Sequence, residues 1–328
     1  MNHRRILRYR LRNLLHSALL LGGMVLLLAA AGSFFGLTAA TLAVVAGVVL
    51  LSAGARMPPG WVLRMHRARP IHPREAPDLH RLVRRLAERS DLSAPPALFL
   101  VPSPVMNAFA VGNAKRSAIG LTEGLLRRLD RRELAGVLAH EISHVAHRDL
   151  WVMGLADMIT RMTHTLSLAG QLMLFLALPL VLLGEYRVPW IALLLLIAAP
   201  TASALLQLAL SRTRELDADL AAAELTGDPR GLASALARLE YQDGGWLRRL
   251  LLPMRRPATS PLLRSHPATA ERIERLRSLA AGPPLRTASG PLPTFPDAGD
   301  LRPAAPRRVR VVRVPRWHPG PLSPHVHG

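Results

Sequence analysis

The pattern His140-Glu141-x-x-His144 has the spacing that points most directly to chemistry. On a helix, residues four apart share a face, so the two imidazoles can bind one Zn²⁺, each at about 2.0–2.1 Å. Glu141 can accept a proton from the metal-activated water and pass it to the leaving amine. The pattern therefore predicts zinc-dependent hydrolysis of peptide bonds. The alternative is a surface helix that carries two unrelated histidines.

A third zinc ligand must come from elsewhere in the chain. The extended metzincin pattern needs Gly at 147 and His at 150, but the sequence has His147, which we expect in solvent, and Leu150. We expect Asp149 on the motif helix, pointing away from the metal. Elimination among later acidic residues favours Glu215, with Asp219 one turn on to orient a histidine ligand. The alternative for this pair is an exposed charge network.

Local signals predict the elements that carry these residues. Asp130 and Glu133 have capping-box spacing, so a helix should follow and carry the zinc motif. Apolar periodicity predicts a helix over 77–90, and a short one should run from Thr122 to Leu129. Further helices are expected over 213–226, 230–240 and 268–279. Strands are expected at 97–101, 107–111 and 117–121, with Gly112 and Asn113 forming the turn between the last two.

Apolar residues are strongly segregated along the chain. Half of the residues are hydrophobic, yet the formal net charge is +20. Residues 13–55 contain no Asp, Glu, Lys or Arg and exceed the roughly 20 residues of one membrane span, so we expect two spans, at 14–31 and 36–54. Residues 165–184 and 188–211 predict a second hairpin. The alternatives are a cleaved signal peptide or a buried core helix for the first block, and a partly embedded or buried hairpin for the second.

The charge pattern indicates orientation and not nucleic-acid binding. Of the 42 basic residues all but Lys115 are Arg, a skew typical of codon bias, and many flank the apolar blocks or lie in the tail. The positive-inside rule then places everything outside the hairpins in the cytoplasm. No nucleic-acid partner is needed to explain the charge. The chain has no Cys, which excludes a disulfide scaffold and a Cys-based zinc finger.

Taken together, these motifs resemble those of the HtpX-like membrane metalloproteases, which are relatives of the CaaX prenyl proteases. The resemblance covers about residues 10–280 and rests on His140-Glu141-x-x-His144 with Asp149, Arg214-Glu215-x-x-Ala218-Asp219, Asn107-Ala108-Phe109-Ala110-x-Gly112 and Ser265-His266-Pro267.

The resemblance implies roles for several residues. Asn107, Ala108, Phe109 and Ala110 would form an edge strand that binds substrate by strand addition. His266 would lie near the zinc and bond the oxyanion, while Asp149 and Asp219 would support the histidine ligands. The alternatives are a turn residue for Asn107 and a helix-start residue for His266.

We therefore expect a mainly α protein with a small β-sheet, in which a zincin-type metalloprotease domain is anchored by transmembrane hairpins. The expected segments are a basic N-terminus (1–12), a hairpin (13–55), the first protease part (56–164), a second hairpin (165–211), the second protease part (212–280) and a disordered Pro/Arg-rich tail (281–328).

The expected function is zinc-dependent endoproteolysis at the inner membrane, with the site facing the cytoplasm. The resemblance implies misfolded membrane proteins as substrates, in quality control. The alternatives are a prenyl-protein protease and a catalytically inactive metal-binding scaffold.

Overall fold

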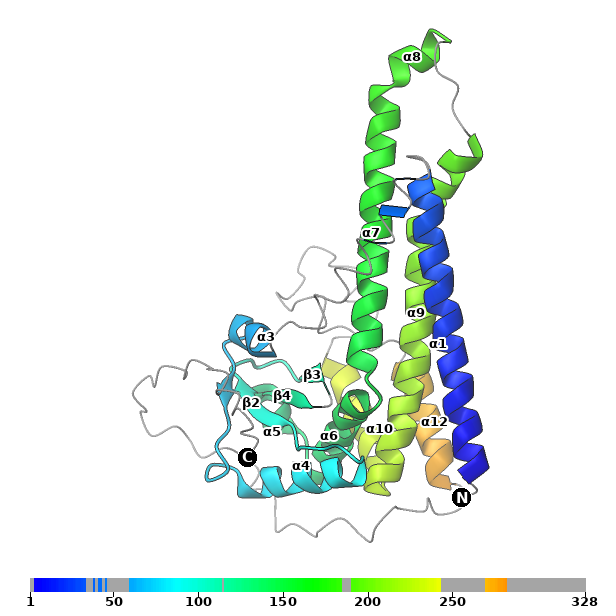
Figure 1. Cartoon of the computed structure of the whole chain (residues 1–328). Coiled ribbons are helices and arrows are strands. Elements are labelled where there is room, and N and C mark those ends of the chain that lie inside the picture. Colours follow the sequence, from blue (N-terminus) through cyan, green and yellow to red (C-terminus); the bar gives the residue numbers. More distant parts are fainter. Residues whose placement is uncertain are drawn as a thin grey trace, which may run out of the picture.

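A computed structural model of the chain describes residues 3–33, 59–113, 115–184, 190–242 and 269–281, with four more residues between 38 and 45. In this part a bundle of three long helices stands on a base that contains the sheet (Figure 1). Most of the predicted second span, nearly all of the predicted tail and His266 lie outside the described residues.

The bundle consists of α1 (His3–Ser33), α7 (Asp149–Leu176) and α9 (Trp190–Thr226), which lie side by side (Figure 1). A short helix, α8 (Leu178–Leu182), follows α7. Among the described residues one helix, Leu193–Thr226 within α9, is long and apolar enough to cross a membrane, and the apolar stretch Ser17–Gly32 of α1 is shorter. The two predicted hairpins stay predictions.

The long helices run through the boundaries expected from the apolar blocks. α7 starts at Asp149, well before residue 165, and α9 continues past residue 211 to Thr226. The helix predicted over 213–226 is therefore the last part of α9. α9 ends where Gly227 takes a positive φ of 70° and its N–H bonds the carbonyl of Ala223.

Polar side chains join α7 to α9 in the apolar part of the bundle. Pro200 lies inside α9 and has no N–H to offer the carbonyl of Leu196, four residues earlier. Ser167 of α7 donates its hydroxyl to that carbonyl at 2.7 Å, and Gln171 donates to the Ser167 oxygen at 2.9 Å. The buried carbonyl therefore has a partner on the neighbouring helix.

The base contains a four-stranded sheet in the order β1-β2-β4-β3. Its strands are β1 (Arg69–Pro70), β2 (Ala97–Val101), β3 (Ala108–Asn113) and β4 (Arg116–Thr122). β2 and β4 are parallel, whereas β1–β2 and β3–β4 are antiparallel. The predicted strands are confirmed, and β3 lies at one edge of the sheet.

The predicted turn between β3 and β4 is wrong. Gly112 and Asn113 belong to β3, where they pair with Ser117 and Arg116. The side-chain oxygen of Asn113 accepts the backbone N–H groups of Lys115 and Arg116, each at 3.0 Å. The turn is therefore closed by the asparagine side chain at the strand end, two residues later than expected.

Further helices complete the base. They are α3 (Pro59–Met65), α4 (Pro77–Arg89), α5 (Glu123–Arg128), α6 (Arg131–Ala146), α10 (Pro229–Gln242) and α12 (Thr269–Ala281). The predicted capping box is present at the start of α6, because Asp130 and Glu133 each bond the other's backbone N–H at 2.9 Å. One buried apolar core joins α4, α6, α10 and α12 to the sheet and the end of α9.

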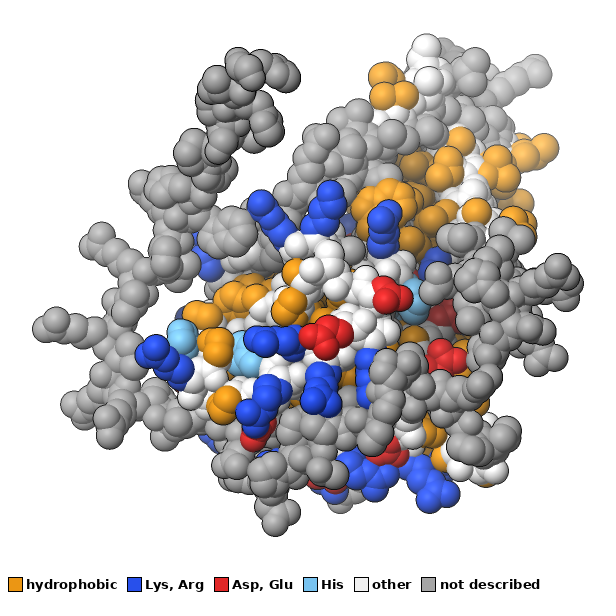
Figure 2. All heavy atoms as spheres, turned by 60° about the horizontal axis from the view of Figure 1, so that its bottom comes forward, with side chains coloured by type: hydrophobic (Ala, Val, Ile, Leu, Met, Phe, Trp, Pro, Cys, Tyr) orange, Lys and Arg blue, Asp and Glu red, His pale blue; other side chains and the backbone are white. Residues whose placement is uncertain are grey.

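Polar and apolar surface are separated between base and bundle. Seen from below, Arg side chains are spread over the base, and hydrophobic side chains gather towards the bundle (Figure 2). In the bundle these include strongly exposed Leu182, Trp190 and Ile191. On this face of the described residues, the exposed Arg side chains therefore gather on the base and the larger exposed apolar surface lies on the bundle.

Candidate metal centre

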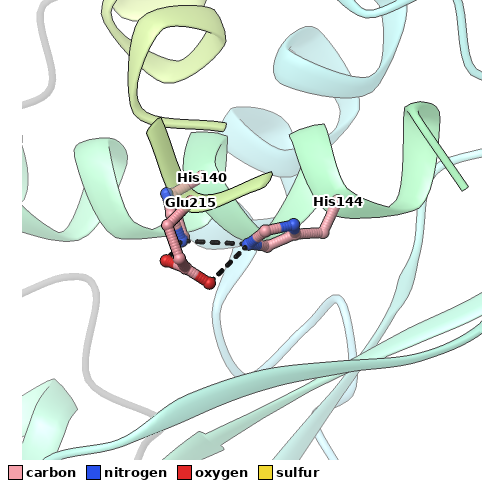
Figure 3. A group of neighbouring side chains, drawn as sticks. All are labelled: His140, His144 and Glu215. Carbon is pink, nitrogen blue, oxygen red and sulfur yellow. Dashed lines mark hydrogen bonds and ion pairs between the residues drawn. The ribbon is translucent and has the colours of Figure 1, made fainter. Parts of the chain in front are cut away.

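The three predicted ligands come together between α6 and α9 (Figure 3). His140 Nε2 lies 3.1 Å from His144 Nε2, and the Glu215 carboxylate lies 3.3 Å from the first and 3.6 Å from the second. All three side chains are buried. α6 supplies both histidines from one face, and the continuous α9 brings Glu215 back from the top of the bundle.

These spacings fit a tetrahedral metal ion. Donor atoms about 2.0–2.1 Å from one ion in tetrahedral geometry lie about 3.3–3.4 Å apart. The three observed separations bracket that value. Two imidazoles and one carboxylate, with a coordination position left over, form the ligand set of a catalytic zinc site.

His144 is oriented by Asp149, which agrees with the supporting role that the resemblance implies and not with the expectation from spacing that this residue points away from the metal. α6 ends at Ala146, and Arg148 takes a positive φ of 59° before α7 begins. This break turns the chain, so that Asp149 Oδ2 lies 3.0 Å from His144 Nδ1. Asp149 is almost fully buried. A carboxylate at Nδ1 leaves the Nε2 lone pair for a metal.

His140 is oriented in the same way by Asp219. Asp219 lies one turn after Glu215 on α9, and its Oδ1 is 3.1 Å from His140 Nδ1. The expected pairing of Glu215 as ligand with Asp219 behind a histidine therefore agrees with the geometry. An exposed charge network is excluded for these two residues, because both are buried.

Sequence reasoning missed Arg272, which reaches the site from α12. Its guanidinium donates two hydrogen bonds of 2.7 Å to Asp219, and Nη1 lies 2.9 Å from Glu215. Burial alone would lower the pKa of Arg272, but the bonds and charge of Asp219 and the charges of Glu215 and Glu141 raise it. One arginine among 41 does not stand out in the sequence. Its contact with the site depends on the tertiary packing of α12.

The carboxylates also hold a proton on His140. Burial opposes its charged form, but hydrogen bonds with Asp219 and Glu215 outweigh that cost and raise the pKa from 6.5 to about 9. In the absence of metal the buried carboxylates thus recruit a positive charge at the ligand position. A divalent cation satisfies the same demand, which agrees with the donor set.

Glu141 and the exposed His147 flank the ligands. Glu141 is buried on α6 and follows His140 directly in the sequence. His147 is the C-cap residue that follows α6, and it is exposed, as expected. His266 lies outside the described residues, so its expected role stays a prediction.

Strand β3 passes beside α6 and α7. The side chains of Ala108, Phe109 and Ala110 are all buried, and the Phe109 ring lies across Gly120, where any side chain would collide with it. Asn107 precedes the strand and pairs through its backbone with Thr122. In Ala108, Phe109 and Ala110 the side chains are therefore covered, and the backbone is the part of the strand that can meet an extended peptide.

The hydrogen-bond register shows which backbone groups face outward. Asn107 and Thr122 form a hydrogen-bonded pair, and such pairs alternate along antiparallel strands. Phe109 and Val111 therefore point their N–H and C=O groups at β4. The corresponding groups of Ala108 and Ala110 point to the edge, where no other strand pairs among the described residues.

Comparison with known proteins agrees with this geometry. The family model for "Peptidase family M48" matches residues 73–280. A "Protease HtpX homolog" from Kineococcus radiotolerans is 39% identical over 295 residues, covering 83% of this chain and 98% of that protein. A homolog from Acaryochloris marina is 39% identical over 229 residues, covering 66% of this chain and 77% of that protein. One from Methylibium petroleiphilum is 32% identical over 281 residues, covering 81% of this chain and 98% of that protein.

A solved structure is also similar. The crystal structure of S. mikatae Ste24p has a TM-score of 0.47 and 21% sequence identity, and the match covers 83% of this chain and 66% of that longer one.

Proposed function

The chain belongs to peptidase family M48, and we propose that it is a membrane-anchored, zinc-dependent endopeptidase. The observation that carries the proposal is the convergence of His140, His144 and Glu215 at tetrahedral donor spacings. Each histidine has a buried carboxylate at Nδ1. Glu141 stands next to the ligands on the same helix. The metal, when bound, supplies Lewis acidity that lowers the pKa of water and polarises the scissile carbonyl.

Glu141 performs the proton transfer. Its carboxylate accepts a proton from the attacking water and delivers it to the amine nitrogen as the C–N bond breaks. Burial next to the ligands excludes bulk water and fixes the distance over which the proton moves. We propose that His266 bonds the oxyanion, as the resemblance implies.

Substrate enters as an extended peptide along β3. The outward N–H and C=O groups of Ala108 and Ala110 offer hydrogen bonds to a substrate backbone, so binding depends little on side-chain identity. Such binding suits an enzyme that removes misfolded membrane proteins of varied sequence, which we propose as its substrates.

The bundle anchors the enzyme in the inner membrane with the base in the cytoplasm. Leu193–Thr226 is long and apolar enough to span a bilayer, and exposed apolar side chains also lie on the other two bundle helices. An aqueous environment does not favour such a surface. Arg residues at the lower ends of the helices agree with a cytoplasmic base.

The test is a protease assay on purified full-length protein in detergent, with casein and with a membrane-protein substrate. Wild type should cleave and hold one zinc per chain, and a chelator should stop cleavage. Glu141→Gln should keep its zinc while hydrolysis falls about 10²–10⁴-fold, because only the proton-transfer group is lost.

Two further variants separate metal binding from chemistry. Glu215→Ala should lose zinc and activity together, whereas Glu224→Ala, a half-buried glutamate on the same helix, should lose neither. Cleavage that survives in Glu141→Gln would contradict the mechanism. A wild type that holds zinc but cleaves nothing would favour the inactive scaffold.

A further inference from the structure

A chain of buried polar side chains connects the N-terminal helix to the metal centre. Arg214 of α9 donates a hydrogen bond from Nη2 to Ser17 Oγ of α1 at 2.5 Å. It donates another from Nη1 to Asp149 Oδ1 of α7 at 3.0 Å. The other oxygen of Asp149 lies 3.0 Å from Nδ1 of His144 on α6. Four helices thus meet through four side chains, each less than a tenth exposed.

Arg214 is suited to this bridging position by its shape. The guanidinium is planar and always charged, and its two terminal nitrogens can reach two partners at fixed directions. The carboxylate of Asp149 is buried, and a buried carboxylate requires a positively charged partner at this depth. If Arg214 were absent, Asp149 would lose that partner and its hold on the imidazole of His144.

We propose that Arg214 is a positioning residue that couples helix α1 to the ligand His144 through Asp149. The N-terminal helix is then part of the metal centre and not only an anchor. The proposal rests on the proposed zinc site, and it adds that the site is complete only while α1 is packed against α9. A purely structural Arg214 would change stability without changing zinc affinity selectively.

The first experiment measures zinc affinity by competition with a chelator, on the full-length protein in detergent. Arg214→Gln and Asp149→Asn should each weaken zinc binding about 10–100-fold, as expected when a partner behind a metal ligand is lost. The double variant should be no weaker than the worse single one, because both changes interrupt the same connection. Ser17→Ala should weaken binding several-fold.

Two more variants serve as controls. Arg161→Gln removes an exposed arginine of α7 that pairs only locally with Asp157, and should bind zinc as wild type does. Arg214→Lys keeps the positive charge but not the two terminal nitrogens of the guanidinium, so its zinc affinity should lie between those of Arg214→Gln and the wild type. If Arg214→Gln fails to fold by circular dichroism, Arg214→Lys and Ser17→Ala carry the same comparison.

A second experiment follows the coupling from the opposite direction. Zinc should slow amide hydrogen exchange around Ser17 in α1 of the wild type, since coupling between two sites is reciprocal. Ser17→Ala should reduce this effect.

The possible results separate the two proposals. A wild type that binds no zinc would overturn the proposed function itself. A wild type that binds zinc while Arg214→Gln binds it equally well would overturn only this inference, and so would fully additive losses in the double variant.

Discussion

At the scale of single residues, the metal centre is a set of buried charges that neutralise one another. Each imidazole has a carboxylate behind it, and each of these carboxylates has an arginine. The two triads are His140–Asp219–Arg272 and His144–Asp149–Arg214. Because an isolated buried charge is costly, loss of either arginine should disturb the ligand in front of it.

The raised pKa of His140 predicts how the stability of the metal-free protein depends on pH. Its folded pKa of about 9 exceeds the unfolded value of 6.5, so its protonation stabilises the folded state fully below pH 6.5. That stabilisation is lost as pH rises towards 9. We expect the unfolding midpoint in excess chelator to fall over this window.

The variant His140→Gln isolates the contribution of His140 protonation to stability. This variant cannot take up the proton, so its midpoint should change less between pH 6.5 and 9. A wild-type midpoint that stays constant or rises over the same range would show that His140 is neutral in the metal-free protein.

The sequence predicted the ligands but not all of their partners. His140, Glu141 and His144 follow from helical spacing, which is local. The contact of Asp149 with His144 depends on the left-handed turn at Arg148, which no local signal announced. Arg272 depends on how α12 packs, and nothing distinguishes its residue type in a chain so rich in arginine.

At the scale of elements, β3 offers a backbone test of substrate binding. Ala110→Pro removes an N–H that points away from β4, so the sheet should keep its ladder while an added substrate strand loses one hydrogen bond. We expect KM for an extended peptide to rise several-fold with little change in the unfolding midpoint.

Val111→Pro is the matched control. Its N–H points at β4, so this change should destabilise the sheet itself. Equal KM values for Ala110→Pro and wild type would argue against strand addition.

Helices α7 and α9 allow a second test, through the carbonyl of Leu196. Ser167→Ala leaves this carbonyl without its donor and should destabilise the protein by about 1–3 kcal/mol. In a Pro200→Ala background the helix supplies its own N–H, so the same change should cost much less. Unfolding in a detergent series would measure this double-mutant cycle, and equal costs in both backgrounds would exclude the compensation.

Element types were easier to predict than element ends. The capping box, the period of 3.6 and the short apolar runs between turn residues predicted α6, α4 and the strands β2, β3 and β4, although β3 runs two residues further than expected. The start of α7 and the C-terminal continuation of α9 were missed, because an apolar block marks where a helix is hydrophobic and not where the helix begins or ends.

At the scale of the whole molecule, the absence of Cys makes orientation measurable. Ser278→Cys puts one thiol on exposed α12, and Leu182→Cys puts one on exposed α8 at the other end of the bundle. In sealed inverted membrane vesicles, which expose the cytoplasmic face, an impermeant maleimide should label the first and should label the second only after permeabilisation. Equal labelling of both in sealed vesicles would contradict a spanning bundle.

Helix α9 is one continuous rod that carries both the exposed Leu208 and the ligand Glu215. Glu215 follows Leu208 by seven positions, or about 10 Å of helix at 1.5 Å per residue. The height of the hydrolytic centre above the bilayer is therefore set by this stretch of helix, and Pro200 lies before Leu208, outside it. We expect the enzyme to cut a polypeptide substrate only at positions that lie about this distance from the lipid surface.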